Sequence, residues 1–353
     1  MKALYINFVD LDNVSSGSSV RPKKIHEAFI NLNINFEMLS GLQNRFSERW
    51  KNSWKFFKKI RKEKYDFCYV ESPSGPMFNL CDHLLLIYIA KVRKVPVGFF
   101  YRDAYWKFAE WYNLGKMKKY IITLMHKFDW IIIKWVCKKI YFPSDTMAEL
   151  FNSKNKSALP PGSSILTTKV NKFENFKNCI YVGGVSERYG TEILLEAFEL
   201  INSKFNMNIT LTLICREEID IIKRYKDKKW LNLKVGLSGQ EILGEFYKKS
   251  DLAIIPFKRD VYMDFAIPIK MFEYMANNMP MVSTNCTEVE KFILGNGIGI
   301  ITDDNYLALA EGIRRFYEIS EEERNIIYKN IQSAMQKNTW EKRLEEVSQL
   351  SNI

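Results

Sequence analysis

The sequence predicts an α/β protein of two domains, each built on a parallel sheet with flanking helices. Its 353 residues are enough for two domains of ordinary size. Short apolar runs rich in β-branched and aromatic residues alternate with longer helical patterns, which is typical of βαβ units. Ten such runs are too many for one sheet of the usual size. They are 3–9, 66–71, 97–101, 139–143, 179–183, 209–215, 231–235, 251–256, 281–284 and 298–301.

A turn-rich stretch divides these runs into two groups. Residues 159–164 (LPPGSS), followed by polar sequence up to Asn178, have the composition of a linker. We therefore expect one Rossmann-like domain at 1–162 and a second at 163–335, facing each other across a cleft. Residues 336–353 contain a helical pattern that we expect to cross back to the first domain.

Basic residues are concentrated in the first half of the chain. Residues 1–170 hold 28 Lys and Arg against 14 Asp and Glu, whereas the remainder holds 24 against 27. Such a bias is typical of a domain that faces an anionic polymer or an anionic membrane surface. The longest apolar run, 84–90, is far below the roughly 20 residues of a membrane helix, so we expect no spanning segment.

Cysteine and histidine usage indicates a reduced protein without a bound metal. The six cysteines are scattered and show no C-x-x-C spacing, and the N-terminal sequence has no secretory apolar region. The three histidines, at 26, 83 and 126, form no recognisable metal-binding cluster. We expect a cytoplasmic protein with no metal and no other cofactor.

The block 268–275 (PIKMFEYM) carries the strongest indication of chemistry. It follows a predicted buried strand, and Pro268 suits the first turn of a helix. Lys270 and Glu273 would then share one face near the positive end of the helix dipole. A cation and a helix N-terminus can hold a diphosphate, and a nearby carboxylate can accept the hydroxyls of a ribose. The alternative is a surface ion pair that stabilises the helix by about 0.2–0.5 kcal/mol.

Two other loops that follow predicted strands offer anion-binding chemistry. Gly183 and Gly184 lie in a strand-to-helix turn whose amides can approach an anion, with Arg188 as a fixed charge. A tight connection is the alternative. Residues 13–22 form a serine- and glycine-rich loop that can hold phosphate through amides and hydroxyls, or can simply be flexible.

The end of the third predicted strand places Arg102 and Asp103 among aromatic residues. Such a pair can orient a substrate or handle a proton, or it can be a structural salt bridge. Two helical stretches, 44–64 and 116–139, interleave lysine and arginine with aromatic and aliphatic residues. Basic amphipathic helices of this kind suit an anionic bilayer surface. The alternative is that the aromatic residues are core and the lysines form a solvated face.

These blocks resemble the retaining GT-B glycosyltransferases of family 4, also called glycosyl transferases group 1. The resemblance rests on the serine/glycine loop with Arg21, the sequence 101–103 (YRD), and 182–184 with Arg188. It continues through 270–276 (KMFEYMA) and 280–283 (PMVS), so it spans nearly the whole chain. The members it most resembles assemble bacterial capsule, O-antigen or other surface polysaccharides.

The resemblance implies that the second domain binds a nucleotide-diphosphate sugar, with a UDP-sugar favoured over a GDP-sugar. Glu273 would accept the ribose hydroxyls, and Arg188 with Lys270 would hold the diphosphate. Arg102 and Asp103 would be the catalytic residues. The other residues implied at the nucleotide-sugar site are Gly17, Ser18, Ser19, Arg21, Gly183, Gly184, Leu237 and Ser238.

The chain departs from the family pattern at three places. The usual Gly-Arg before the diphosphate loop is Gly183-Gly184 here, and the usual lysine is displaced to Arg188. The family has two glutamates separated by seven residues, but the position of the first is Phe265, with Asp264 beside it. Many relatives also have a histidine where Arg102 and Asp103 stand. The resemblance further implies retention without a protein nucleophile, because the leaving diphosphate can act as base toward the incoming hydroxyl.

We therefore expect a glycosyltransferase bound peripherally to the inner face of the cell membrane through 44–64 and 116–139. It would move a sugar to a lipid-linked glycan and bind no nucleic acid. Two alternatives stay open. A sugar-nucleotide epimerase of similar architecture would need neither acceptor nor membrane. A nucleic-acid-binding module would explain the basic half through salt-dependent phosphate contacts but would leave 268–275 unexplained.

Overall fold

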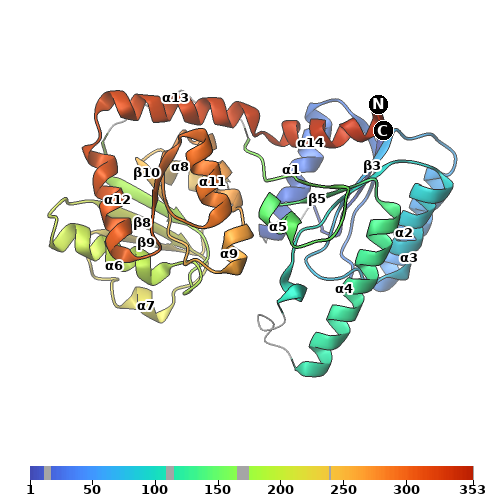
Figure 1. The fold of residues 1–353 in the computed structure, drawn as a ribbon, viewed down its shortest axis with the longest axis horizontal. Helices are drawn as coiled ribbons and strands as arrows, with labels where there is room; N and C mark the ends of the chain where they lie inside the picture. Colours follow the sequence, from blue (N-terminus) through green and yellow to red (C-terminus); the bar gives the residue numbers. More distant parts are fainter. Residues whose placement is uncertain (12–16, 109–114, 165–174, 238–239, 353) are drawn as a thin grey trace. The chain divides into compact units, whose positions relative to one another are not determined.

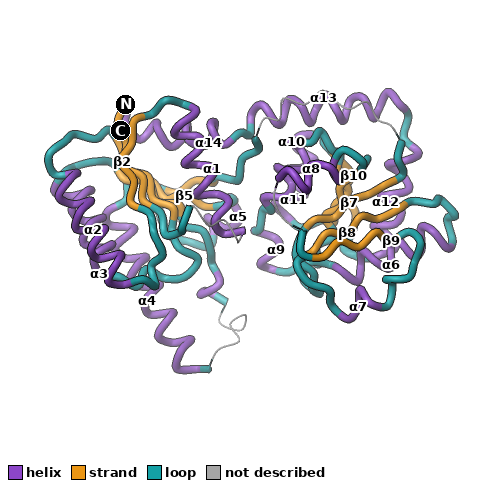
Figure 2. The backbone as a smooth tube through the Cα atoms, turned by 180° about the vertical axis from the view of Figure 1, so that it is seen from behind, coloured by secondary structure: helices purple, strands orange, loops and turns teal. Residues whose placement is uncertain are grey.

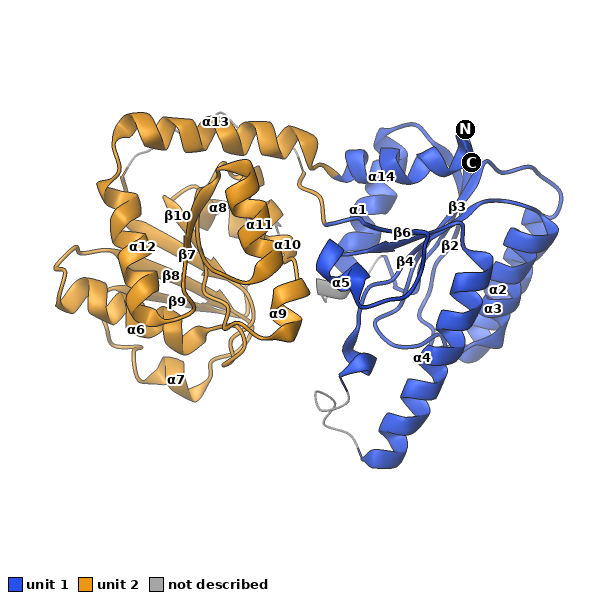
Figure 3. Ribbon diagram, viewed as in Figure 1, with its two compact units in different colours: residues 1–160, 340–353 blue, residues 161–339 orange. Residues whose placement is uncertain are grey.

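A computed structural model gives the positions of residues 1–11, 17–108, 115–164, 175–237 and 240–352. The chain forms two compact units, residues 1–160 with 340–353 (unit 1) and residues 161–339 (unit 2) (Figure 3). Each unit has one parallel six-stranded sheet with helices around it (Figure 2). This confirms the predicted α/β class with two Rossmann-like domains.

Unit 1 has the strand order β2-β1-β3-β4-β5-β6 (Figure 1). Its central strands are buried along their whole length, as expected where helices cover both faces. Its elements are β1 (Lys2–Ile6), α1 (Gly17–Asn31), β2 (Asn35–Leu39), α2 (Phe46–Ile60), β3 (Phe67–Glu71), α3 (Leu80–Ile87), β4 (Val97–Phe100), α4 (Lys116–Val136), β5 (Lys139–Phe142), α5 (Asp145–Glu149), β6 (Lys156–Ala158) and α14 (Trp340–Ser348). Short π- and 3-10-helical turns are η1 (Tyr88–Val92), η2 (Tyr105–Lys107) and η4 (Gln349–Asn352).

The C-terminal helix α14 belongs to unit 1, where it packs on α1. Trp340 and Leu344 share a buried cluster with Tyr5 and Phe29. Arg343 Nε donates to the carbonyl of Pro160 at 3.1 Å, which fixes the helix to the point where the chain leaves this unit.

Unit 2 has the strand order β12-β11-β10-β7-β8-β9. Two separate apolar clusters lie against its sheet, one including residues of α6 and α12 and the other residues of α10, α11 and α13. Its elements are β7 (Asn178–Val182), α6 (Thr191–Ser203), β8 (Thr210–Cys215), α7 (Asp220–Lys223), β9 (Leu231–Val235), α8 (Gln240–Tyr247), β10 (Leu252–Ile255), α9 (Val261–Phe265), α10 (Ile269–Ala276), β11 (Met281–Thr284), α11 (Thr287–Asn296), β12 (Gly299–Thr302), α12 (Tyr306–Glu318) and α13 (Glu321–Lys337).

Two strands were not predicted from the sequence. Both are edge strands of unit 1: β2 is only partly buried, and the three residues of β6 are all half-buried. A strand at an edge needs no continuous apolar run, so its composition gives little signal. The reading of 13–22 as a loop was also wrong in part, since α1 begins at Gly17 and includes Pro22.

Every helix in the described part of the chain is too short or too polar to span a bilayer. All six cysteines are buried and free.

In each sheet the chain starts at an inner strand, β1 or β7, and then extends to both sides. The strand order therefore reverses beside β1 and beside β7, and open α/β sheets bind ligands at the carboxyl ends of the strands at such a reversal.

Candidate active site

In unit 2 the reversal lies between the neighbouring strands β7 and β10. The loop after β7 carries Gly183, Gly184 and Arg188, and the segment after β10 leads through α9 to the start of α10. The phenol of Tyr274, on α10, accepts a hydrogen bond of 3.0 Å from the backbone of Val182 at the end of β7. The fold thus places the two predicted loops and the N-terminal half of α10 at one edge of the sheet.

Lys270 and Glu273 form the i,i+3 ion pair on α10, with Nζ and Oε2 2.6 Å apart. Each side chain is about one-third exposed, at 32% and 30%. The hydroxyl of Tyr247, on α8, donates to the same Oε2 at 3.2 Å. Both bonds engage one oxygen, and Oε1 accepts none from a residue whose side chain the structure describes. The carboxylate is thus held in place while one of its oxygens stays open to a ligand.

Arg188 joins the loop after β7 to the loop after β10. Its Nε lies 2.8 Å from Oδ2 of Asp260, and its guanidinium lies over the ring of Tyr262 at 5.2 Å. Asp260 also caps α9 through a 2.8 Å bond from the backbone of Met263. An anion at this edge would meet a guanidinium whose position is already fixed by a carboxylate.

Gly190 is a part of this site that the sequence reading missed. Its φ of +64° lies in the left-handed region, and a Cβ there would lie 1.6 Å from the carbonyl oxygen of Pro256. Only glycine allows the loop after β7 to approach the end of β10 this closely. In the sequence Gly190 stands directly before the helix at Thr191, where a glycine looks like an ordinary turn residue.

Phe265, at the position of the missing family glutamate, and its neighbour Asp264 both have structural roles. Phe265 is buried, and the carboxylate of Asp264 accepts bonds from Arg259 at 3.0 Å and from the backbone and hydroxyl of Thr287 at 2.9 and 2.8 Å. These bonds hold α9 against α11. Leu237 packs half-buried against the core of unit 2, whereas Ser238 lies outside the described residues.

Arg21 has internal partners in unit 1. Its Nε bonds Glu71 at 2.9 Å, its Nη1 bonds the carbonyls of Leu159 and Pro160, and its guanidinium lies over Phe100 at 3.6 Å. With 4% of its surface exposed, it ties α1 to the sheet and to the end of the unit. Of the neighbouring predicted residues, Gly17 and Ser18 open α1 and Ser19 is buried.

Arg102 and Asp103 follow β4 but have different partners. Arg102 Nη2 lies 3.7 Å from Oε2 of the fully buried Glu71. Oδ1 of Asp103 accepts a 3.0 Å bond from the backbone of Tyr105. Burial raises the pKa of the Asp103 carboxyl to about 7, so it is partly protonated near neutral pH.

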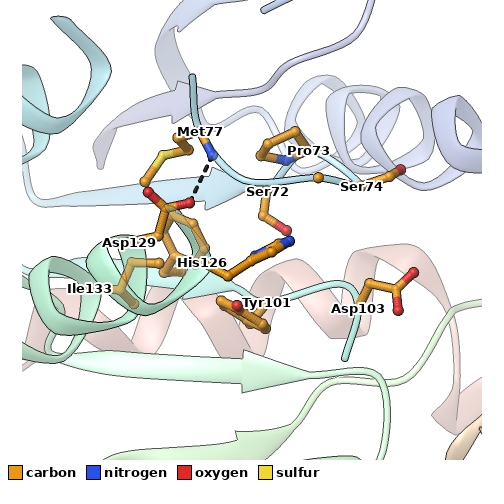
Figure 4. Close-up of a pocket in the computed structure, with 11 residues that line it drawn as sticks. Ser72, Pro73, Ser74, Met77, Tyr101, Asp103, His126, Asp129 and Ile133 are labelled. Carbon is orange, nitrogen blue, oxygen red and sulfur yellow. Dashed lines mark hydrogen bonds between the residues drawn. The ribbon is translucent and has the colours of Figure 1, made fainter. Parts of the chain in front are cut away.

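Asp103 lines a small cavity in unit 1 together with His126 and Asp129 of α4 and the loop 72–75 after β3 (Figure 4). Asp129 is held by His83 Nε2 at 2.7 Å and by the backbone of Met77 at 2.7 Å. Burial lowers the pKa of His126 to about 4, so its imidazole is neutral at pH 7. The sequence reading assigned α4 only to membrane docking, although Asp129 is its single acidic residue and lies one turn after His126.

Comparison with known proteins gives one family match within unit 2. Residues 176–318 match the family described as Glycosyl transferases group 1. No curated protein sequence matches the chain.

Three solved structures share the fold over the whole chain. Sucrose-phosphate synthase from Thermosynechococcus elongatus matches with a TM-score of 0.67 and 13% identity, covering 100% of this chain and 98% of that one. Anabaena Alr3699/HepE in complex with UDP matches with a TM-score of 0.64 and 12% identity, covering 100% of both chains. WaaG, a glycosyltransferase involved in lipopolysaccharide biosynthesis, matches with a TM-score of 0.63 and 12% identity, covering 99% of both. Residues 176–318 thus match the glycosyl transferases group 1 family, and the whole chain has the two-domain GT-B fold of these glycosyltransferase structures.

Proposed function

We propose that the protein moves a sugar, with retention at the anomeric carbon, from a UDP-sugar to a lipid-linked glycan during synthesis of a surface polysaccharide. Unit 2 binds the donor, and unit 1 binds the acceptor and faces the membrane. The observation that carries the proposal is the start of α10, where Lys270 and Glu273 lie at the sheet reversal inside the matched segment 176–318. The presence of UDP in HepE and the lipopolysaccharide role of WaaG support the choice of donor and acceptor class.

In this proposal Glu273 binds the ribose and the two cations bind the diphosphate. The open oxygen of Glu273 accepts the ribose hydroxyls, and Tyr247 keeps the carboxylate oriented. Lys270 turns from Glu273 to the diphosphate, and Arg188 meets the other side of it. The N-terminal amides of α10 and the amides of Gly183 and Gly184 add partial positive charge. Cations and oriented amides stabilise the charge that develops on the leaving diphosphate.

The acceptor and membrane role of unit 1 is supported by exposed apolar and basic residues on three neighbouring helices. α3 contacts both α2 and α4, and the three helices lie side by side in Figure 1. Their exposed large apolar residues include Trp50 and Trp54 on α2, Leu84 on α3, and Ile131 and Trp135 on α4. Lysines at 51, 55, 58, 127 and 134 are exposed on the same helices. Apolar side chains surrounded by lysines suit an anionic bilayer surface.

Not every basic residue of the predicted docking segment faces outward. Arg49 on α2 is buried, with Nε 2.9 Å from Oδ1 of Asp82.

Between α3 and α4 there is an apolar groove of about 320 Å³, with Phe78, Leu80 and Phe128 in its lining. A groove of this size on the docking surface is suited to part of a hydrocarbon chain of the acceptor.

A binding screen followed by a transfer assay tests the proposal. UDP, GDP, UDP-sugars and GDP-sugars are added to the purified protein, and the melting temperature is recorded; a ligand that binds the folded state raises it by mass action. We expect stabilisation by UDP compounds. The stabilising donor is then incubated with a bacterial membrane lipid extract, and we expect labelled sugar in the lipid fraction. Stabilisation with conversion of the donor to an epimeric nucleotide sugar, and no transfer, would reject the transferase assignment.

A further inference from the structure

The imidazole of His126 is buried and has an unused nitrogen. His126 is 4% exposed, and its Nε2 has no hydrogen-bond partner among the residues with described side chains. The ring is held by stacking on Trp106, with centroids 5.5 Å apart and planes 9° from parallel. Trp106 is itself fixed by a 2.9 Å bond to Tyr101. Buried polar atoms are rarely left unpaired in native proteins, so this nitrogen calls for a ligand or a water molecule.

The cavity beside His126 offers space for one small polar group. Its volume is about 10 Å³, which is close to the minimum for a single water-sized group. It lies at the carboxyl ends of β3 and β4, where parallel sheets bind ligands. Ser74, in the loop that lines it, is exposed, which places the cavity close to the surface of the unit.

The charge state of the cavity favours a neutral hydroxyl group. His126 is uncharged at pH 7. Two carboxyl groups line the cavity, and that of Asp129 is already bonded to His83 and to the backbone of Met77. Asp103 can accept a hydrogen bond when ionised and donate one when protonated. Among the described residues that line the cavity, a phosphate would meet carboxyl groups and no Lys or Arg, whereas a sugar hydroxyl can both donate and accept.

We propose that this cavity is a subsite for one hydroxyl group of the acceptor sugar, bound between Nε2 of His126 and the carboxyl of Asp103. The subsite rests on the function proposed above, and it assigns acceptor recognition to a histidine from α4. His126 then determines which acceptor sugars position their hydroxyl correctly, since a sugar that lacks the hydroxyl leaves the buried nitrogen unpaired.

Three variants separate acceptor binding from structural effects. His126→Phe keeps a ring on Trp106 but removes the nitrogen. His126→Gln restores a polar group near the position of Nε2 and is the conservative rescue. Gly75→Leu places a side chain at the mouth of the cavity, where a Cβ meets no atom within 4 Å and the backbone is not left-handed.

The kinetic test uses the donor found in the binding screen and a membrane lipid extract as acceptor. We expect His126→Phe and Gly75→Leu to raise the acceptor KM about tenfold, with the donor KM and UDP affinity unchanged, and His126→Gln to recover most of the loss. A raised donor KM with an unchanged acceptor KM would overturn the assignment. An altered melting temperature with both KM values unchanged would mean that the cavity holds only a structural water.

A direct binding test does not depend on turnover. The chain has three histidines, so ¹⁵N-histidine labelling gives a spectrum in which His126 is identified by its loss in His126→Phe. We expect octyl glycosides of glucose, galactose or N-acetylglucosamine to shift the His126 Nε2 signal and leave His26 unchanged. No shift with any of them overturns the subsite. UDP binding in the same sample shows whether the donor part of the proposed function stands independently.

Discussion

Replacing Glu273 by alanine is the sharpest test of the donor site. The carboxylate is proposed to accept the ribose hydroxyls through charge-assisted hydrogen bonds, and such a bond contributes about 1.5–3 kcal/mol. Its loss corresponds to a weakening of UDP affinity by about 10- to 150-fold, since 1.4 kcal/mol is a factor of ten. Isothermal titration of the purified variant with UDP measures this directly.

The structural part of the same change is small and can be controlled. Glu273→Ala also removes the ion pair with Lys270, which contributes about 0.2–0.5 kcal/mol to the helix. Glu245→Ala is the matched control, because Glu245, on α8 of the same unit, forms an i,i+3 pair with Lys248 at 2.8 Å. It should leave UDP affinity unchanged. If Glu273→Ala binds UDP as tightly as the wild type, the ribose assignment is wrong and the pair on α10 is only a surface ion pair.

Three further predictions concern the loop, the docking surface and pH. Gly190→Ala should lower the free energy of unfolding in urea by about 1–3 kcal/mol, since its Cβ would overlap a carbonyl. Gly244→Ala on α8 has open space around its Cβ and should raise that free energy by about 0.5–1 kcal/mol. Equal effects of the two changes would refute the close approach of Gly190 to Pro256. Glutamine at lysines 51, 55 and 58 should weaken sedimentation with anionic vesicles by about 1 kcal/mol per charge, whereas the same change at lysines 226, 229 and 248 should have little effect; unchanged binding would place the docking surface elsewhere. The pKa of His126 is lowered in the folded state to about 4, so the unfolded chain binds the proton more readily and stability falls as pH drops from about 6.5 toward 4. His126→Gln should reduce this loss of stability, as measured by urea denaturation at pH 5 and pH 7. An unchanged difference between the two pH values would contradict the assignment.

The sequence predicted the ion pair on α10 but not the longer-range contacts around it. Lys270 and Glu273 are three residues apart on one helix, so local periodicity was enough to predict that their side chains meet. The pairing of Arg188 with Asp260 joins residues 72 apart, and nothing in either local pattern indicates it. Gly190 likewise depends on a contact with Pro256, which only the packed sheet brings near.

In unit 1 the partners of charged residues were decided by burial. Arg102 and Asp103 are adjacent in sequence, yet Arg102 lies beside Glu71 and Asp103 lines the cavity. Arg49 looked like one cation among many in a basic helix, but it is buried against Asp82 on α3. A buried guanidinium must find a carboxylate wherever the fold supplies one, and that choice depends on distant segments.

By itself, the amino-acid sequence determined the alternation of strands and helices, the two parallel sheets and the helix that carries Lys270 and Glu273, because these depend on periodicity and composition over short stretches. Only the tertiary structure decided the strand order, and with it the reversal between β7 and β10, the closeness of Gly190 to Pro256 and the cavity that His126 and Asp103 both line. The physical reason is that these features arise from contacts between residues far apart in the chain, whose partners are fixed by close packing and by the need to pair buried polar groups.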